Sequence, residues 1–219
     1  MNPTHLDAFV AIPHQTQGAV GSTPAKWARS CDLDAIPDAT LLPEQPLTRR
    51  EVRAICTDPA RPVLFGFVCA MAWGGQSKSN AVRAWKSREP LQNKLARLRA
   101  GEMTRTEAFE IFAGKNWISG LGPAYFTKLL YFFSPAPTNY IMDQWTARSI
   151  NLITGRKVVL MAGDYVSGYS TGAHYQVFCD EIDAMAVKLD CAGQDIEERM
   201  FSQGGRKPWP WRAYVKRHG

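Results

Sequence analysis

The residues with the clearest chemical potential lie between Ile118 and Ile150. A turn, Gly120-Leu121-Gly122, precedes an apolar helix that contains Lys128, and Asp143 follows a Pro-rich loop, where the next helix is expected to begin. Glycines in a tight turn can present backbone amides to a phosphate. A lysine close to a carboxylate can act as an activated nucleophile. This combination indicates an enzyme that acts on nucleic acid.

Helical periodicity dominates the chain and predicts an all-α protein. Residues 62–73 are apolar on almost every side, which is typical of a central buried helix, and Gly74-Gly75 should end it. Thr104 and Glu107 have the spacing of a capping box, so a helix is expected from there to about Ala113. Further helices are expected at 47–57, 123–133, 143–152 and 174–189. Residues 158–170 fit either a strand or a helix that ends in a loop.

The charge of the chain is unevenly distributed. The net charge of +6 and a pI near 9.1 favour polyanionic partners. Eight Lys or Arg and only two acidic residues lie between Gln76 and Arg105, and the residues after Gln203 include five Lys or Arg and no acid. A one-sided phosphate-binding surface would produce this asymmetry, and so would solvated helix faces with a mobile basic tail. Arg206 and Lys207 in that tail are candidate DNA contacts.

The length of 219 residues suits two helical lobes that share a cleft. The sequence divides into an N-terminal arm or extension at 1–45, a helical domain at 46–203 and a basic, Trp-rich tail at 204–219. The five cysteines are scattered without a CxxC motif, and the N-terminus lacks the pattern of a signal peptide, so a cytoplasmic protein with reduced thiols is expected. Metal-ligand spacing is absent, no cofactor is expected, and no apolar run is long enough to span a membrane.

Residues 111–133 are expected to form a helix-hairpin-helix, in which a helix ends near Trp117 and a second helix begins at Pro123. An ordinary glycine-linked helical hairpin would look the same at this level. However, the sequences GLGPAYFTKLLYFF and YIMDQWTARSI together resemble the helix-hairpin-helix DNA glycosylase superfamily. The likeness is closest to its 8-oxoguanine glycosylase branch and the small bacterial members of that branch. In this superfamily an aspartate stands at the N-terminus of the helix after the hairpin, and Asp143 lies 21 residues after Gly122, a fitting separation.

The resemblance implies two helical lobes flanking a cleft, and a monomer that binds double-stranded DNA with one base flipped out. The enzyme would act on the bacterial nucleoid. The hairpin residues Gly120-Leu121-Gly122 and Ala124 would contact the DNA backbone. Asp143 would stabilise the positive charge that develops on the sugar as the glycosidic bond breaks. An aspartate at this position is also a common helix N-cap.

Lys128 departs from the pattern of the superfamily. Members that also cleave the DNA strand carry their Schiff-base lysine two residues after the second hairpin glycine, where this chain has Ala124. Lys128 lies four residues later on the same helix face, and its side chain could reach the same pocket. Burial among apolar neighbours would lower its pKa and free the amine as a nucleophile. Alternatively, Lys128 reaches solvent or pairs with an acid.

A flipped base requires aromatic surfaces that receive it. Trp145, Trp73 and Phe132 are candidate pocket residues, and Trp145 is the best placed because it lies two residues after Asp143. The sequence therefore predicts a DNA glycosylase that excises a damaged or modified base, 8-oxoguanine by resemblance, with strand cleavage by β-elimination if Lys128 is the nucleophile. The same mechanism could remove hypermodified bases from phage DNA in antiviral defence. A non-catalytic helix-hairpin-helix protein would bind DNA and release no base.

Overall fold

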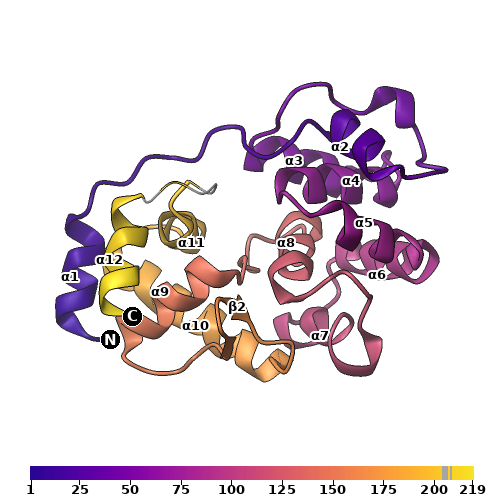
Figure 1. Ribbon diagram of the computed structural model, residues 1–219. Coiled ribbons are helices and arrows are strands. Elements are labelled where there is room, and N and C mark those ends of the chain that lie inside the picture. Colours follow the sequence, from indigo (N-terminus) through magenta and orange to yellow (C-terminus); the bar gives the residue numbers. More distant parts are fainter. Residues whose placement is uncertain (204–206, 208) are drawn as a thin grey trace.

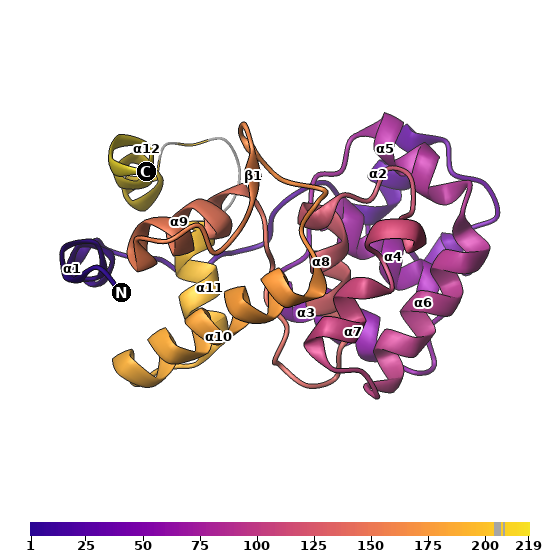
Figure 2. The same ribbon diagram turned by 90° about the horizontal axis from the view of Figure 1, so that it is seen from below.

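The computed structural model describes residues 1–203, 207 and 209–219, and this part of the chain is mostly helical. The helices form two groups (Figures 1 and 2). The first group, here called the hairpin lobe, comprises α2 (Pro24–Cys31), η1 (Ala39–Leu41), α3 (Arg49–Thr57), α4 (Val63–Trp73), α5 (Lys78–Trp85), α6 (Arg88–Ala100), α7 (Arg105–Glu110), η2 (Gly114–Asn116) and α8 (Pro123–Phe133). The second group, the terminal lobe, comprises α1 (Pro3–Ala11), α9 (Gln144–Thr154), α10 (Gly172–Leu189), α11 (Gly193–Phe201) and α12 (Pro210–His218). The predicted all-α, two-lobed architecture is confirmed.

Helix α4 forms the centre of the hairpin lobe. All of its residues from Leu64 to Trp73 are buried, because α2, α3, α6 and α8 pack around it. A helix that is apolar on every side has no face to turn toward water, so it must be enclosed in this way. It ends at Gly74, as predicted.

The hairpin differs from its predicted form before the turn. The helix that the Thr104–Glu107 capping box starts ends at Glu110, and the segment up to Trp117 contains only the short 3-10 helix η2. Gly114 has a φ of +55°, a left-handed conformation that interrupts a right-handed helix. The second helix, α8, begins at Pro123 as predicted. Its proline occupies a position where the missing N–H costs no hydrogen bond.

The turn of the hairpin packs tightly against α5. Gly120 has a φ of +87°, and a Cβ at this position would lie 2.2 Å from the backbone oxygen of Asn80. The carbonyl oxygen of Gly120 also accepts a hydrogen bond from the Gln76 side chain at 2.9 Å. Any residue other than glycine would push the turn away from α5, so the position of the hairpin depends on Gly120.

The terminal lobe contains both ends of the chain, with α1 and α12 side by side (Figure 1). The ring of Phe9 on α1 contacts that of Trp211 on α12 at a centroid distance of 4.9 Å, and the Trp211 indole donates a hydrogen bond to Ser149 of α9 at 2.8 Å. From α1, residues 12–22 cross to the hairpin lobe without forming a helix; this part is here called the crossing segment. The predicted N-terminal arm thus contains α1, the crossing segment and α2, and the predicted tail contains α12.

Residues 158–170, which the sequence left open, contain a small antiparallel hairpin of β1 (Met161–Ala162) and β2 (Tyr165–Val166). Strand β2 packs against α8 and α9. Helix α10 follows and packs against α7, which provides a direct contact between the lobes. No helix in the described ranges is long and apolar enough to span a lipid bilayer.

Candidate active site

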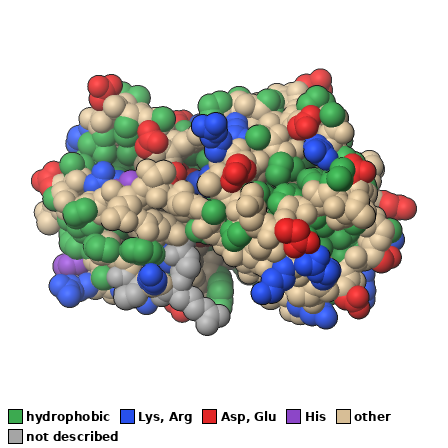
Figure 3. All heavy atoms as spheres, turned by 90° about the horizontal axis from the view of Figure 1, so that it is seen from above, with side chains coloured by type: hydrophobic (Ala, Val, Ile, Leu, Met, Phe, Trp, Pro, Cys, Tyr) green, Lys and Arg blue, Asp and Glu red, His purple; other side chains and the backbone are tan. Residues whose placement is uncertain are grey.

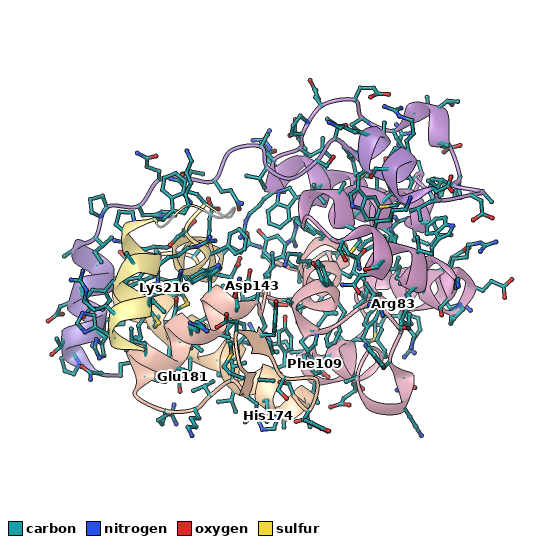
Figure 4. All side chains as sticks on the ribbon, in the orientation of Figure 1. Arg83, Phe109, Asp143, His174, Glu181 and Lys216 are labelled. Atoms are coloured by element: carbon teal, nitrogen blue, oxygen red, sulfur yellow. The ribbon has the colours of Figure 1, made fainter. Side chains whose placement is uncertain are left out.

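Asp143 caps the N-terminus of α9. Its Oδ1 accepts hydrogen bonds from the backbone amides of Trp145 (2.8 Å) and Thr146 (3.2 Å), and its own amide donates to the Thr146 hydroxyl (2.9 Å). Its second oxygen, Oδ2, accepts no hydrogen bond from any residue that the structure describes. One oxygen therefore fixes the carboxylate, and the other is available for chemistry. Asp143 lies between the two lobes (Figure 4).

Lys128 extends back along α8 toward the hairpin turn. Its Nζ donates a hydrogen bond to the carbonyl oxygen of Ala124 at 2.6 Å and lies 5.6 Å from the centre of the Tyr125 ring. The amine is thus at the level of Ala124, one helical turn before its own Cα. Gly74 makes room for the aliphatic part of the side chain, since a Cβ there would lie 2.9 Å from Cδ of Lys128.

Lys128 and Asp143 are both buried, with exposed fractions of 4% and 7%. Burial lowers the pKa of Lys128, because the charged ammonium is removed from water. The Asp143 carboxylate opposes this shift more strongly than any other charged group, and Glu197 follows. The Asp143 carboxylate thus acts electrostatically on the Lys128 ammonium and favours its charged form.

A buried ion pair joins the lobes next to this site. Arg49 of α3 forms two hydrogen bonds with the carboxylate of Glu197 of α11, and its Nε donates to Gln17 of the crossing segment at 2.7 Å. Burial alone would favour the neutral guanidine, but the Glu197 carboxylate raises the pKa of Arg49 and keeps it charged. The pair holds α3, α11 and the crossing segment together at the inner end of the space between the lobes.

Two of the predicted pocket residues, Trp73 and Phe132, lie in this interior. Their rings meet edge to face at a centroid distance of 5.1 Å, and Trp73 also stacks on Phe201 of α11 at 6.0 Å. The Trp73 indole nitrogen is buried and has no hydrogen-bond partner among the described residues. A base can stack on Trp73 only after Phe201 has moved, so these rings are accessible only if the lobes separate.

Trp145 lies against α12. The guanidinium of Arg212 is 4.6 Å from the centre of its ring, and the Nζ of Lys216 is 5.6 Å away. Burial lowers the pKa of Arg212 to about 10, while Asp143 acts in the opposite direction. Both cations therefore lie on the Asp143 side of the terminal lobe, and they cover the ring that the sequence predicted as a base platform.

The hairpin turn presents free backbone donors. The amides of Gly122 and Ala124 donate no hydrogen bond to any described residue, as expected in the first turn of a helix. Leu121 is fully buried, and its carbonyl oxygen accepts a hydrogen bond from the Trp117 indole at 2.9 Å. A hollow of about 230 Å³ opens beside the turn, and Gly120, Gly122, Ala124, Tyr125 and Arg83 are among the residues that line it. Arg83 brings a positive charge to a place where free amides already favour an anion.

The surface is indented between the lobes, and Lys and Arg side chains gather on the hairpin-lobe side of the indentation at its lower end in Figure 3. In Figure 4, Lys216 on α12 and Arg83 on α5 lie on opposite sides of Asp143. Lys207 is exposed in the terminal lobe, with its Nζ 5.5 Å from the centre of the Trp209 ring. Arg206 lies outside the described residues.

Arg49 and Glu197 had not been predicted as site residues, and they are 148 residues apart. No local sequence pattern relates them. What sets Glu197 apart from the solvated acids of the chain is its burial within a helix, and that is visible only in the structure. The structure thus brings together Lys128, Asp143 and the hairpin turn, places Trp73 and Phe132 in the interior, and places Trp145 under α12.

The chain matches a protein-family model. Residues 13–201 match the family described as "Putative 8-oxoguanine DNA glycosylase OGG-like protein". Comparison with curated proteins and with solved structures gives no match. The matched region includes the hairpin lobe with its hairpin and Lys128, and α9, α10 and α11 of the terminal lobe with Asp143, and it covers well over half of the sequence. The chain therefore belongs to the 8-oxoguanine DNA glycosylase OGG-like family.

Proposed function

We propose that this protein is a DNA N-glycosylase that flips a damaged base out of double-stranded DNA and excises it, with 8-oxoguanine as the substrate that the family suggests. The observations that carry the proposal are a buried lysine of lowered pKa, held at the hairpin turn by Ala124, and a buried carboxylate with one free oxygen that acts electrostatically on that lysine. Glycosidic bond cleavage needs both a nucleophile and a negative charge near the sugar.

The hairpin turn would hold the DNA backbone. The free amides of Gly122 and Ala124, with Arg83 beside them, suit a phosphate oxygen. Lys207 and Lys216 add positive charge on the terminal lobe. A strand bound across both lobes would bring its sugar to Asp143, which lies between them.

In the reaction, the neutral Nζ of Lys128 attacks C1′ of the sugar, and the bond from C1′ to the base breaks with its electron pair moving to the base. The base leaves after taking up a proton, and Nζ gives a proton to Oδ2 of Asp143. Asp143 passes this proton to O4′ as the C1′–O4′ bond breaks, and the protonated C1′=Nζ imine forms. Loss of a C2′ proton to water then allows β-elimination of the 3′ phosphate. If Lys128 does not attack, Asp143 activates a water molecule instead, and the product is an intact strand with an abasic site.

Base flipping in this reaction requires the lobes to separate slightly, because Trp73 and Phe132 are enclosed. Trp145, together with the Arg212 and Lys216 cations that lie over its ring, would contact the base or the neighbouring phosphate. The protein acts as a monomer in this scheme, since both reacting side chains come from one chain.

The test is the release of free base from a panel of duplexes, with 8-oxoguanine, other oxidised bases and undamaged guanine at one position, together with phage genomic DNA that carries hypermodified bases. We expect 8-oxoguanine to appear in solution with wild-type protein and not with Asp143→Asn. Release only from the phage DNA would reassign the substrate and keep the mechanism. Salt-sensitive binding without release of any base would contradict the proposal and identify a non-catalytic DNA-binding protein.

A further inference from the structure

A second cavity lies on the outer side of the hairpin, away from Lys128. It has a volume of about 500 Å³ between the hairpin turn and residues 166–170, and no charged side chain lines it. Gly122 and Gly168 are both at its wall, and a Cβ built on either would meet no atom within 4 Å. The cavity is therefore open space that suits an uncharged group.

Aromatic rings form much of the wall. Phe112 and Phe126 stack at a centroid distance of 5.6 Å, with their planes 9° apart, and both are buried, so they support the wall from behind. Trp117 and Tyr169 also line the cavity, although 60% and 89% of their surfaces are exposed. Single exposed aromatic side chains are common, but here both border one apolar cavity, where their rings remain open to a ligand. Their rings are suited to a flat ligand, because flat π-systems stack on one another.

One polar group in the wall has no partner. Ser170 is 3% exposed, and its hydroxyl oxygen is buried without a hydrogen bond to any described residue. A buried hydroxyl without a partner is costly, and its presence in a wall calls for an explanation. Because this oxygen is enclosed, a ligand with one polar edge would satisfy it once the Ser170 side chain turns toward the cavity.

The cavity adjoins the predicted phosphate site. Gly122, whose amide is free, lines both this cavity and the hollow beside Ala124. Phe126 is two residues from Ala124 and from Lys128, about 200° around the helix, so the cavity faces away from the reacting side chains. A group bound in this cavity would be attached to a DNA backbone whose phosphate lies on the hairpin turn, and it would not reach Lys128.

We propose that this cavity binds one unpaired nucleobase of the DNA strand whose phosphate lies on the hairpin turn. A nucleobase is flat, uncharged and polar at its edge, and it is attached to an anion, which matches the aromatic walls, the Ser170 hydroxyl and the neighbouring free amide. The site is separate from the one that receives the excised base. This proposal depends on one part of the proposed function, namely that the hairpin turn binds DNA.

The test compares two single-stranded 12-mers in titrations with the full-length protein. One strand carries thymine bases, and the other has the same phosphate backbone with abasic tetrahydrofuran units. We expect the wild type to bind the base-bearing strand about tenfold more tightly, since stacking of a base on aromatic side chains strengthens binding by about this much or more. Ser170→Ala and Gly168→Leu, which removes the open space, should reduce this preference about fivefold or more. Gly18→Leu, which also enters open space, is the matched control and should keep it.

Thermal unfolding of each variant shows whether it is folded, and Trp117→Ala provides an additional variant at a largely exposed position. Equal binding of both strands by the wild type would overturn the proposal. Folded Gly168→Leu, Ser170→Ala and Trp117→Ala variants that keep the full preference would overturn it as well. Base release is measured separately. If the protein shows the cavity-dependent preference but excises no base, the proposed function is contradicted and the proposed nucleobase site is supported. If the protein excises a base and the cavity variants bind both strands like wild type, only the proposed nucleobase site is contradicted.

Discussion

Arg49 and Glu197 come from different lobes and form a two-point ion pair that is shielded from water. The Nε of the same guanidinium also binds Gln17 in the crossing segment. The ring centres of Trp73 and Phe201 lie 5.2 and 5.1 Å from the guanidinium carbon. This one side chain thus contacts three separate parts of the chain, and the spacing of the lobes depends on it.

We expect Glu197→Gln to lower the free energy of unfolding by about 3–5 kcal/mol, because the buried Arg49 charge would lose its partner. Urea unfolding followed by circular dichroism measures this change. The double variant Arg49→Met/Glu197→Leu should recover much of the loss, since no unpaired charge remains. Glu44→Gln, which breaks the exposed pair with Arg29, is the control and should leave the unfolding midpoint unchanged. A Glu197→Gln midpoint equal to that of wild type would show that the pair does not hold the lobes.

Asp143→Asn should reduce base release at least 100-fold while leaving the affinity for DNA near that of wild type. Asparagine keeps a cap for α9, because its amide oxygen can accept the same two hydrogen bonds, and it removes the negative charge near the sugar. Single-turnover excision and anisotropy titration measure the two quantities. Asp195→Asn is the matched control: its carboxylate also accepts a backbone hydrogen bond at a helix start, on α11. Turnover of Asp143→Asn within a few-fold of wild type would remove Asp143 from the reaction.

Lys128→Gln should abolish the covalent protein–DNA adduct that borohydride traps from an imine. Lys94→Gln is the control, because the Lys94 ammonium also donates to a backbone carbonyl and has a pKa lowered by burial. An adduct that persists in Lys128→Gln would assign the imine to another amine. A wild-type protein that releases base and traps no adduct would indicate hydrolysis assisted by Asp143.

The rate of adduct formation should rise with pH. Burial depresses the pKa of Lys128 below the ordinary lysine value, so raising the pH from neutral to about 9 increases the fraction of neutral, nucleophilic amine. Single-turnover trapping across this range measures the effect, and the DNA affinity at each pH serves as the control. A trapping rate that falls as the pH rises, at constant affinity, would contradict a neutral amine as the attacking group.

Lys216→Gln and Lys207→Gln should each weaken DNA binding and lower the salt dependence of the affinity by about one released counterion. Point substitutions are the proper test, because deletion of residues 204–219 would also remove the buried Trp211 from the terminal lobe. Titrations at several salt concentrations measure the slope. The control is Lys188→Gln, since Lys188 lies in the last turn of α10, away from the hairpin. Unchanged slopes in both variants would place the DNA elsewhere.

The sequence alone was sufficient for features that local chemistry determines. The Thr104–Glu107 capping box, the all-apolar α4 and the start of α8 at Pro123 each follow from the properties of a few neighbouring residues. The length of the first hairpin helix was predicted wrongly: it ends at Glu110, and Gly114, in the left-handed conformation that glycine readily adopts, keeps it from continuing to Trp117.

Long-range partners could not be predicted in this way. Nothing near Arg49 in the sequence indicates that its partner is Glu197, and nothing near Trp145 indicates that Arg212 covers its ring. Lys128 lies between these two cases. Its place on the Ala124 side of the helix follows from helical spacing, whereas the hydrogen bond that draws its amine back to Ala124 requires the space that Gly74 leaves.

The contact of α1 with α12 has a consequence for biosynthesis. Helix α1 can contact its partners, α9 and Trp211 of α12, only after the hairpin lobe that lies between them in the sequence has been made. Because domains made on the ribosome generally fold in the order of translation, the hairpin lobe can become compact before α1 has packed against its partners. The lobe that holds Asp143 can therefore complete its packing only after the hairpin lobe has been made.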